Sequence, residues 1–365
     1  MERRQFLKLG AVAGSGLAAA AGAAPAFAQS LPEVKWRLTS SFPKSLDTLH
    51  GAAEFLVKRV AEMTDNRFQL QLFAAGEIVP GLQVLDATQA GTVEMAWTTG
   101  YYNWGKDTAF AFSTGVPFGL NARMLEAWYQ QGGGLEMIQD LFKAYNCHVI
   151  KMGDTTAQMG GWFRNEIKSV DDLKGLKFRI GGFAGRVVSK LGIIPQQIAA
   201  GDIYPALEKG TLDAVEWIAP ADDVKLGFVK IAKYYYFPGW WEGGASGHIL
   251  VNMDKWNELP ANYKAILTAA AHEAGSWMMS KYDYTNPGAL KQLIAQGALL
   301  RPFPPDVMDA AYKATQETCD DEAAKNPRFK KIYDSVKAFR KDAYQWWQVN
   351  ELSFDTYQVR METRS

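Results

Sequence analysis

The sequence is poor in the residues that build most metal and thiol centres. Its 365 residues include only two cysteines and four histidines. Cys147 and Cys319 lie far apart without a C-x-x-C spacing, and no H-E-x-x-H spacing relates the histidines, so a zinc site is unsupported. The two cysteines can pair in an oxidising compartment, but we expect two buried free thiols.

Motifs for nucleotide binding and hydrolysis are also missing. Residues 181–185 fail the G-x-G-x-x-G fingerprint, no P-loop occurs, and residues 244–248 are not a G-x-S-x-G elbow. The adjacent carboxylates Asp222 and Asp223 lie in a polar stretch, which we interpret as a solvated face. The sequence therefore favours a protein without catalytic activity, with an exported periplasmic enzyme as a remote alternative.

Charge of one sign is lacking as well. The chain carries 39 basic and 39 acidic side chains, so its composition gives no electrostatic signature for nucleic acid or an anionic membrane. Beyond the first residues, no apolar run approaches the roughly 20 residues that span a bilayer. We therefore predict no nucleic-acid partner.

The N-terminus predicts export. Arg3 and Arg4 precede a small-residue apolar stretch that ends at Ala26-Phe27-Ala28, an A-x-A cleavage pattern. Residues 1–28 are therefore expected to be a twin-arginine signal peptide, and the mature protein to be periplasmic. A membrane anchor is the weaker alternative, because glycines interrupt the stretch and it ends at a processing site.

Hydrophobic periodicity predicts an α/β fold. Strands expected at 34–39, 68–73 and 93–98 alternate with helices at 46–63 and 81–89, as in a mostly parallel sheet. A second series has strands at 148–152, 159–163 and 178–180, and helices at 184–191 and 203–209. We expect the last helix to begin after a cap at Asp202.

An internal similarity suggests two related lobes. Residues 91–96 and 210–215 share the order glycine, threonine, apolar, acidic, apolar, apolar. Their alignment sets residues 97–101 opposite Glu216 and Trp217. Because ligands in open α/β sheets bind at the carboxyl ends of strands, we predict two α/β lobes that meet at a shared, hinged cleft. Chance similarity is the alternative.

The residues at those strand ends suit an acid beside a cation. Arg179 ends an apolar stretch before Gly181 and Gly182, which permit close approach of a ligand. A fixed guanidinium can bind a carboxylate through two parallel hydrogen bonds. Glu216, the Gln158 side-chain oxygen and backbone carbonyls are hard ligands for a small cation. An ordinary ion pair for Arg179 and Glu216, and a core amide for Gln158, are the alternatives.

Four runs of the sequence resemble a known family. Residues 158–163, 176–182, 201–210 and 213–217 are similar to the extracytoplasmic solute receptors of TRAP transporters, the DctP family, and closest to the branch that binds 2-oxo acids such as pyruvate. The similarity runs from Trp36 to about Tyr344. It implies an organic acid as solute and the small and large TRAP membrane subunits as partners.

The resemblance also implies roles for single residues. Arg179 would bind the solute carboxylate, while Gln158, Glu216 and the Trp217 carbonyl would hold a cation. By resemblance this cation is sodium, with calcium as the alternative. Other solutes remain open, namely lactate with calcium, a dicarboxylate or a sugar acid, although no second arginine besides Arg186 is evident for a second carboxylate.

Three further residues are candidates for the solute site. Tyr101 and Asn103 belong to a polar-aromatic loop of the first lobe, where a phenol can donate to the acid. Phe183 is expected at the apolar end of the cleft, and Trp217 can also serve as an apolar wall. The aromatic run at 234–244 is either a lid over the solute or packing around the hinge.

The predicted strands, helices and lobes lead to a division of the chain into domains. We assign residues 31–153 and 244–285 to lobe I, residues 154–243 and 286–326 to lobe II, and residues 327–365 to a C-terminal helical tail. Phe329, Ile332, Val336, Phe339 and Ala343 form an apolar stripe on that tail, and the stripe continues into Trp346 and Trp347. In the resembling branch this helix packs on a second subunit as a swapped homodimer. The alternative is that it folds back on its own lobe.

Overall fold

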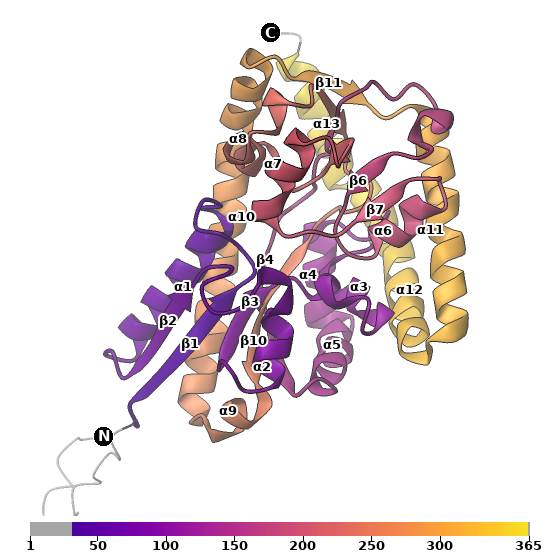
Figure 1. Cartoon of the computed structure of the whole chain (residues 1–365). Helices are drawn as coiled ribbons and strands as arrows, with labels where there is room; N and C mark the ends of the chain where they lie inside the picture. Colours follow the sequence, from indigo (N-terminus) through magenta and orange to yellow (C-terminus); the bar gives the residue numbers. More distant parts are fainter. Residues whose placement is uncertain (1–30, 364–365) are drawn as a thin grey trace, which may run out of the picture. The chain divides into compact units, whose positions relative to one another are not determined.

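The computed structural model describes residues 31–363, and the predicted signal peptide lies outside them. In the described part the strands form a five-stranded and a six-stranded sheet (Figure 1). The first sheet has the order β2-β1-β3-β10-β4, with β1 Val34–Ser40, β2 Phe68–Phe73, β3 Met95–Thr98, β4 Cys147–Asp154 and β10 Ser246–Asn252. The second has the order β11-β9-β5-β8-β6-β7, with β5 Trp162–Phe163, β6 Lys177–Arg179, β7 Ile194–Gln196, β8 Ala214–Val215, β9 Tyr234–Phe237 and β11 Leu299–Pro302.

The two sheets share one plan of strand directions. In the first, β1 is parallel to β2 and β3, and β10 is antiparallel to β3 and β4. In the second, β6 is parallel to β7 and β8, and β5 is antiparallel to β8 and β9, with β11 added in parallel beside β9. The predicted α/β class with mixed sheets is therefore confirmed.

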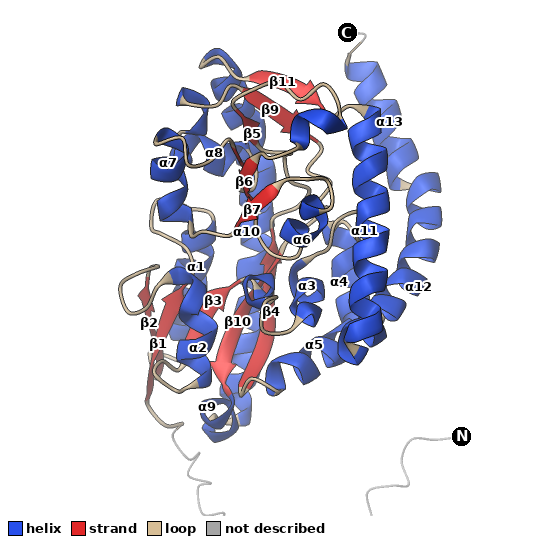
Figure 2. Ribbon diagram, turned by 45° about the vertical axis from the view of Figure 1, so that its right-hand side comes forward, coloured by secondary structure: helices blue, strands red, loops and turns tan. Residues whose placement is uncertain are grey.

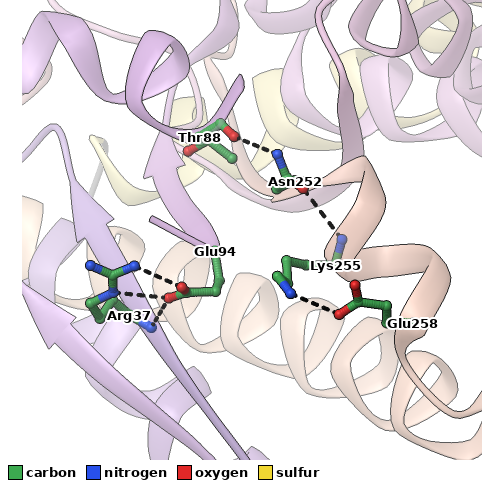
Figure 3. Close-up of polar contacts among 6 residues, drawn as sticks. All are labelled: Arg37, Thr88, Glu94, Asn252, Lys255 and Glu258. Carbon is green, nitrogen blue, oxygen red and sulfur yellow. Dashed lines mark hydrogen bonds and ion pairs between the residues drawn. The ribbon is translucent and has the colours of Figure 1, made fainter. Parts of the chain in front are cut away.

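The internal similarity of the sequence has a structural cause. Glu94 and Asp213 are the residues just before β3 and β8. The Glu94 carboxylate accepts the backbone N–H of Arg37 on β1 at 2.8 Å, and Asp213 accepts that of Lys177 on β6 at 2.8 Å. Figure 3 shows the Arg37 guanidinium also bound to Glu94. In both sheets the acidic residue thus fixes the start of an equivalent strand, so the similarity is not chance.

The helices cover and join the sheets (Figure 2). They are α1 Leu49–Met63, α2 Val84–Gln89, α3 Ala111–Thr114, α4 Ala122–Gln131, α5 Gly134–Lys143, α6 Ala184–Ser189, α7 Ala200–Glu208, α8 Pro220–Leu226, α9 Met253–Glu258 and α10 Ala261–Ala295. The 35-residue helix α10 packs against α1 and β4 beside the first sheet and against α8, which follows β8 of the second. A Cβ at Gly275 would lie 2.5 Å from the Gly153 nitrogen, so this glycine allows α10 to approach β4.

Asn252 ties the end of the first sheet to two helices (Figure 3). Its side-chain amide donates to the Thr88 carbonyl of α2 at 2.9 Å. Its side-chain oxygen accepts the backbone N–H groups of Asp254 and Lys255 and so caps α9. Within residues 31–363, no helix has both the length and the apolar composition needed to cross a bilayer.

Several predicted boundaries were wrong by a few residues. The helix expected from 203 begins at Ala200 with Ala199 as its N-cap, and Asp202 lies in its first turn, where the helix dipole favours a carboxylate. The strand expected at 159–163 is only Trp162–Phe163. Gly161 has a φ of +81°, which ends the extended backbone, and a Cβ there would meet the Val215 carbonyl at 2.5 Å.

The C-terminal region consists of α11 Pro305–Lys325, α12 Pro327–Val349 and α13 Glu351–Glu362. Helices α11 and α12 lie side by side (Figure 1 and Figure 2). Phe329, Ile332 and Val336 are buried in the chain's own core, and the Phe329 ring packs on Phe112 with 4.7 Å between ring centroids. The first half of the apolar stripe therefore folds back on its own chain, whereas Trp346 is 64% exposed.

Two further expectations concern the thiols and the lobes. Cys147 and Cys319 are free and buried, as expected, and burial raises the pKa of each thiol to about 12. The predicted lobe boundaries stay a prediction, because Glu33–Ser365 form one compact unit.

Candidate functional site

A small cavity lies where strands of both sheets end. β3 leads into Thr99, β6 ends at Arg179, and β8 leads through Glu216 into Trp217. Thr99, Arg179 and Trp217 line the cavity together with Gln158, Tyr101 and Tyr102. Its free volume is about 20 Å³, which is room for about one water molecule. The sequence thus predicted correctly that the carboxyl ends of β3, β6 and β8 meet.

Hydrogen bonds and a cation–π contact fix the position of the Arg179 side chain. Its side chain is 1% exposed. Nη1 donates to the Glu216 carbonyl at 2.6 Å and to Glu216 Oε1 at 2.5 Å, and Nε donates to the Ile198 carbonyl at 3.4 Å. The guanidinium carbon lies 4.8 Å from the centre of the Trp217 ring, a cation–π contact. The guanidinium is therefore a fixed positive charge in the cavity wall.

The charges of this pair depend on each other. Burial is the largest single influence and would lower the pKa of Arg179, but Glu216, Tyr102, Tyr101 and Glu242 together outweigh it and raise the pKa. Burial raises the pKa of Glu216, while the Arg179 charge and the Gly181 N–H, at 2.8 Å from Oε1, oppose that shift. Because Arg179 stays charged at any physiological pH, the cavity wall keeps a guanidinium that a carboxylate can bind.

Two buried oxygens beside Arg179 have no hydrogen-bond donor in the described part of the chain. They are Gln158 Oε1 and Glu216 Oε2. Gln158 Nε2 donates to the Thr155 hydroxyl at 3.0 Å, which leaves the amide oxygen as the free end. The Trp217 carbonyl likewise accepts no hydrogen bond from the described residues. Buried oxygens without donors are costly, and a small cation would satisfy them. The predicted ligand set therefore fits a cation.

The pair Gly181 and Gly182 has a different role from the one expected. We expected the glycines to admit a ligand, but the Tyr101 ring occupies the space above them. A Cβ on Gly182, whose φ is +59°, would lie 2.0 Å from Tyr101 Cδ2, and a Cβ on Gly181 would lie 2.8 Å from the Tyr101 hydroxyl. The glycines therefore admit a side chain from the segment after β3, and Tyr101 reaches the cavity as predicted.

Three predicted site residues do not line this cavity, namely Glu216, Asn103 and Phe183. Glu216 is joined to it through its hydrogen bonds with Arg179. Asn103 is buried and donates to the Gly100 carbonyl of its own turn at 3.3 Å. Phe183 is fully buried at the start of α6 and packs on Phe329 with 5.6 Å between ring centroids. Phe183 follows the binding segment in sequence, but its side chain points into the core beneath the C-terminal helices.

Other groups at or near the cavity were not among the predicted binding residues. Thr99 and Tyr102 line the cavity, and the buried Thr99 hydroxyl has no partner among the described residues. Glu242 is also buried, and its Oε2 likewise has no hydrogen-bond partner among the described residues. Its backbone carbonyl accepts the Gln158 N–H at 3.2 Å. Burial, and then the charge of Glu216, raise the pKa of Glu242 well above its usual range. The only sequence signal for Glu242 was an acidic residue inside an aromatic run.

The aromatic run at 234–244 packs in the core. Tyr235 stacks on Trp162 with 4.0 Å between centroids, and Trp241 packs on Phe178 and Phe303. The run does not contribute side chains to the cavity wall. Of the two alternatives, packing between elements is the one the structure shows.

The prediction that Asp222 and Asp223 form a solvated face was wrong. Both are buried on α8. Asp222 accepts the Tyr282 hydroxyl at 2.8 Å, and Asp223 accepts the Trp162 indole N–H at 3.0 Å and the Tyr235 hydroxyl at 2.5 Å. Burial raises the pKa of Asp222 to about 6 and that of Asp223 to about 7. The polar stretch is buried because α8 packs between the second sheet and α10. Neutral hydrogen-bond donors from both compensate the cost of burying the two carboxyl groups.

Known proteins resemble this chain over nearly its whole length. Residues 39–326 match the family described as bacterial extracellular solute-binding protein, family 7 (DctP). A monocarboxylate 2-oxoacid-binding periplasmic protein of Nostoc sp. is 51% identical over 327 residues, which are 90% of each chain.

Two solved structures are similar throughout. A TRAP transporter solute-binding protein of Bordetella bronchiseptica is 50% identical, with a TM-score of 0.90 over 91% of this chain and 99% of that one. It is a mixed-occupancy dimer with copurified calcium and picolinate in one active site and an apo second site. A TRAP periplasmic solute-binding protein of Pseudoalteromonas atlantica with bound sodium and pyruvate is 36% identical, with a TM-score of 0.86 over 88% and 98%.

These findings confirm the resemblance drawn from the sequence. The family match extends over both sheets and includes Gln158, Arg179, Glu216 and Trp217. The chain therefore belongs to family 7 of the bacterial extracellular solute-binding proteins, the DctP family.

Proposed function

We propose that this chain is the periplasmic solute-binding subunit of a TRAP transporter. It takes up a small 2-oxo monocarboxylate, pyruvate or a close analogue, together with one cation. It delivers the solute unchanged to the small and large membrane subunits. Export by the twin-arginine route brings the chain to the periplasm, and residues 31–153 with 244–285 and residues 154–243 with 286–326 act as the two lobes.

One observation carries the proposal. A buried, fixed guanidinium and the buried Gln158 Oε1, which has no donor, lie at one cavity. Glu216, which is bonded to that guanidinium, carries a second buried oxygen without a donor, Oε2. The guanidinium attracts an anion, and the oxygens attract a cation. A metal carboxylate satisfies both at once, whereas an acid without a cation leaves the two oxygens unpaired.

The solute class follows from what relatives bind. Pyruvate carries a keto oxygen, and picolinate a ring nitrogen, on the carbon next to the carboxylate. Either compound can hold one cation through two neighbouring donor atoms. Tyr101, Tyr102 and Trp217 give this cavity aromatic walls, which suit a short apolar end better than a second carboxylate.

The cation would be held by Gln158, Glu216 and the Trp217 carbonyl, and it would offset the negative charge of the solute. We propose sodium, with calcium as the alternative, because relatives contain either ion. A set with one carboxylate and otherwise neutral oxygens favours the ion of lower charge.

Calorimetry with matched acids tests this function. Pyruvate is expected to bind in sodium buffer and to bind at least about tenfold more weakly in potassium buffer with a calcium chelator, because the two oxygens then lose their cation. Propionate, which lacks the keto oxygen, and succinate, which adds a carboxylate, serve as controls. Equal binding of pyruvate and propionate would contradict the proposal, and conversion of pyruvate during incubation would favour the enzyme alternative.

We also propose a homodimer formed through the exposed end of the tail. Trp346, Phe354 and Tyr357 are 64%, 62% and 55% exposed on α12 and α13, an apolar surface that favours a partner. The Bordetella relative is a dimer. A second copy is the occupant that this similarity supports.

Light scattering after gel filtration tests the dimer. The chain without residues 1–28 is expected to be a dimer, and the double variant Trp346→Asp/Phe354→Asp a monomer, since each charge would be buried unpaired in the interface. Tyr284→Asp is the control, because Tyr284 is 88% exposed on α10. A double variant that stays dimeric would show that the interface lies elsewhere.

A further inference from the structure

One side chain bridges the segments that follow β3 and β6. Gln197 comes directly after β7 of the second sheet. Its Oε1 accepts the Gly182 N–H at 2.8 Å, and its Nε2 donates to the Tyr102 carbonyl at 3.0 Å. Gly182 follows β6, whereas Tyr102 belongs to the short 3-10 turn Gly100–Asn103 that follows β3 of the first sheet. The amide therefore spans from one sheet's binding segment to the other's.

This bridge lies next to the proposed binding residues. The carbonyl of Ile198, the residue after Gln197, accepts Arg179 Nε at 3.4 Å. At its other end, Tyr102 lines the cavity and its ring stacks on Tyr101 with 5.2 Å between centroids. Two adjacent residues thus contact the guanidinium through the Ile198 carbonyl and the opposite cavity wall through the Gln197 side chain.

In this form the cavity is too small for an organic acid. A free volume of about 20 Å³ admits about one water molecule, and pyruvate is several times larger, so its entry requires the walls to separate. The bond from Gly182 to Gln197 joins residues that both follow strands of the second sheet, and it can persist. The bond from Gln197 to the Tyr102 carbonyl crosses between the walls and must open.

We propose that Gln197 sets the lifetime of the closed, solute-loaded form. Its oxygen stays bound to Gly182 and orients the amide, so that the N–H is ready for the Tyr102 carbonyl when the walls meet. The crossing bond exists only in the closed form. It therefore stabilises that form and slows release of the solute, while capture, which begins from the open form, is little affected. This inference rests on the proposed function.

The expected effect is that of one neutral hydrogen bond formed only on closure. Removing it should accelerate release about three- to tenfold. The association rate should change less than about twofold, as expected when affinity changes appear mainly in the dissociation rate. A purely structural role would lower the melting temperature without separating the two rates.

Stopped-flow tryptophan fluorescence measures both rates for pyruvate. Gln197→Ala removes both bonds. Gln197→Glu keeps an acceptor for the Gly182 N–H but cannot donate to Tyr102, so it should release pyruvate at least as fast as Gln197→Ala. Gln196→Ala is the matched control, because Gln196 is the adjacent glutamine, and its backbone carbonyl, bonded to Ile180 N–H at 3.2 Å, is kept in the variant.

The outcomes separate the two proposals. If wild type binds pyruvate and both Gln197 variants release it faster than the Gln196→Ala control, the inference holds. If wild type binds pyruvate and the Gln197 variants release it at the control rate, only the role of Gln197 is overturned. If wild type binds none of the tested acids, the proposed function fails, and this inference fails with it.

Discussion

Replacing Arg179 with methionine is expected to weaken pyruvate binding by about two to three orders of magnitude. The methionine side chain is of similar length but carries no charge, so a carboxylate entering the cavity would be desolvated without a cationic partner. The change also removes the partner of Glu216, whose Oε1 would keep only the Gly181 N–H. Calorimetry in sodium buffer gives the affinity, and thermal unfolding gives the accompanying loss of stability.

Two further variants separate charge from geometry at this position. Arg179→Lys keeps the charge but loses the planar fork, so it should recover much of the stability and only part of the affinity. Arg186→Met is the control, because Arg186 lies outside the cavity and pairs with Glu322 at 2.9 Å. A folded Arg179→Met protein with wild-type affinity would exclude Arg179 as the carboxylate-binding residue.

The arrangement of this site could be predicted largely because it depends on strand ends. Glu94 and Asp213 occupy equivalent positions before β3 and β8. Each carboxylate accepts a backbone N–H from the neighbouring strand, and this equivalence appears in the sequence as a repeated pattern. A pattern of that kind places Arg179 and Trp217 near the end of the same sheet. The comparison of two segments within one chain thus predicted that these strand ends meet, and the resemblance to the receptor family indicated Arg179 and Gln158 as binding residues.

The partners of buried polar groups could not be predicted in the same way. Asp222 and Asp223 lie in a stretch with a polar composition, but two of their three donors, Tyr282 and Trp162, lie about 60 residues away on each side. Their burial depends on how α8 packs on α10 and on β5, which local periodicity does not encode. For Glu242, too, the surrounding aromatic run indicated core packing but not that its backbone carbonyl accepts the Gln158 N–H.

Side-chain direction at the ends of short elements was the other limit. Gly182 and Phe183 are neighbours in sequence, yet one contacts Tyr101 at the cavity and the other packs under Phe329. The positive φ of Gly182 turns the chain between them. A reversal of direction at one residue has no periodic signature, so the sequence predicted both residues for the cleft.

Replacing Gly182 with alanine is expected to weaken pyruvate binding about ten- to a hundredfold, because overpacking of a close contact typically costs about 1–3 kcal/mol. The new Cβ would lie 2.0 Å from Tyr101 Cδ2 and 2.5 Å from Cγ, so the ring could not keep its place when the walls meet. The effect should appear in affinity measured by calorimetry, since the contact forms between the two walls and its loss destabilises the closed form.

The backbone strain of the substitution has its own control. Gly175 has a φ of +76° with nothing within 4 Å of a built Cβ, so Gly175→Ala carries the strain of a left-handed alanine without a clash. It should lower thermal stability slightly and leave pyruvate affinity unchanged. In a Tyr101→Ala background the ring is gone, and Gly182→Ala should then add little further loss, a non-additive result typical of residues in contact. Full additivity of the two substitutions would mean that the glycine serves the fold of its own segment and not the closure of the cavity.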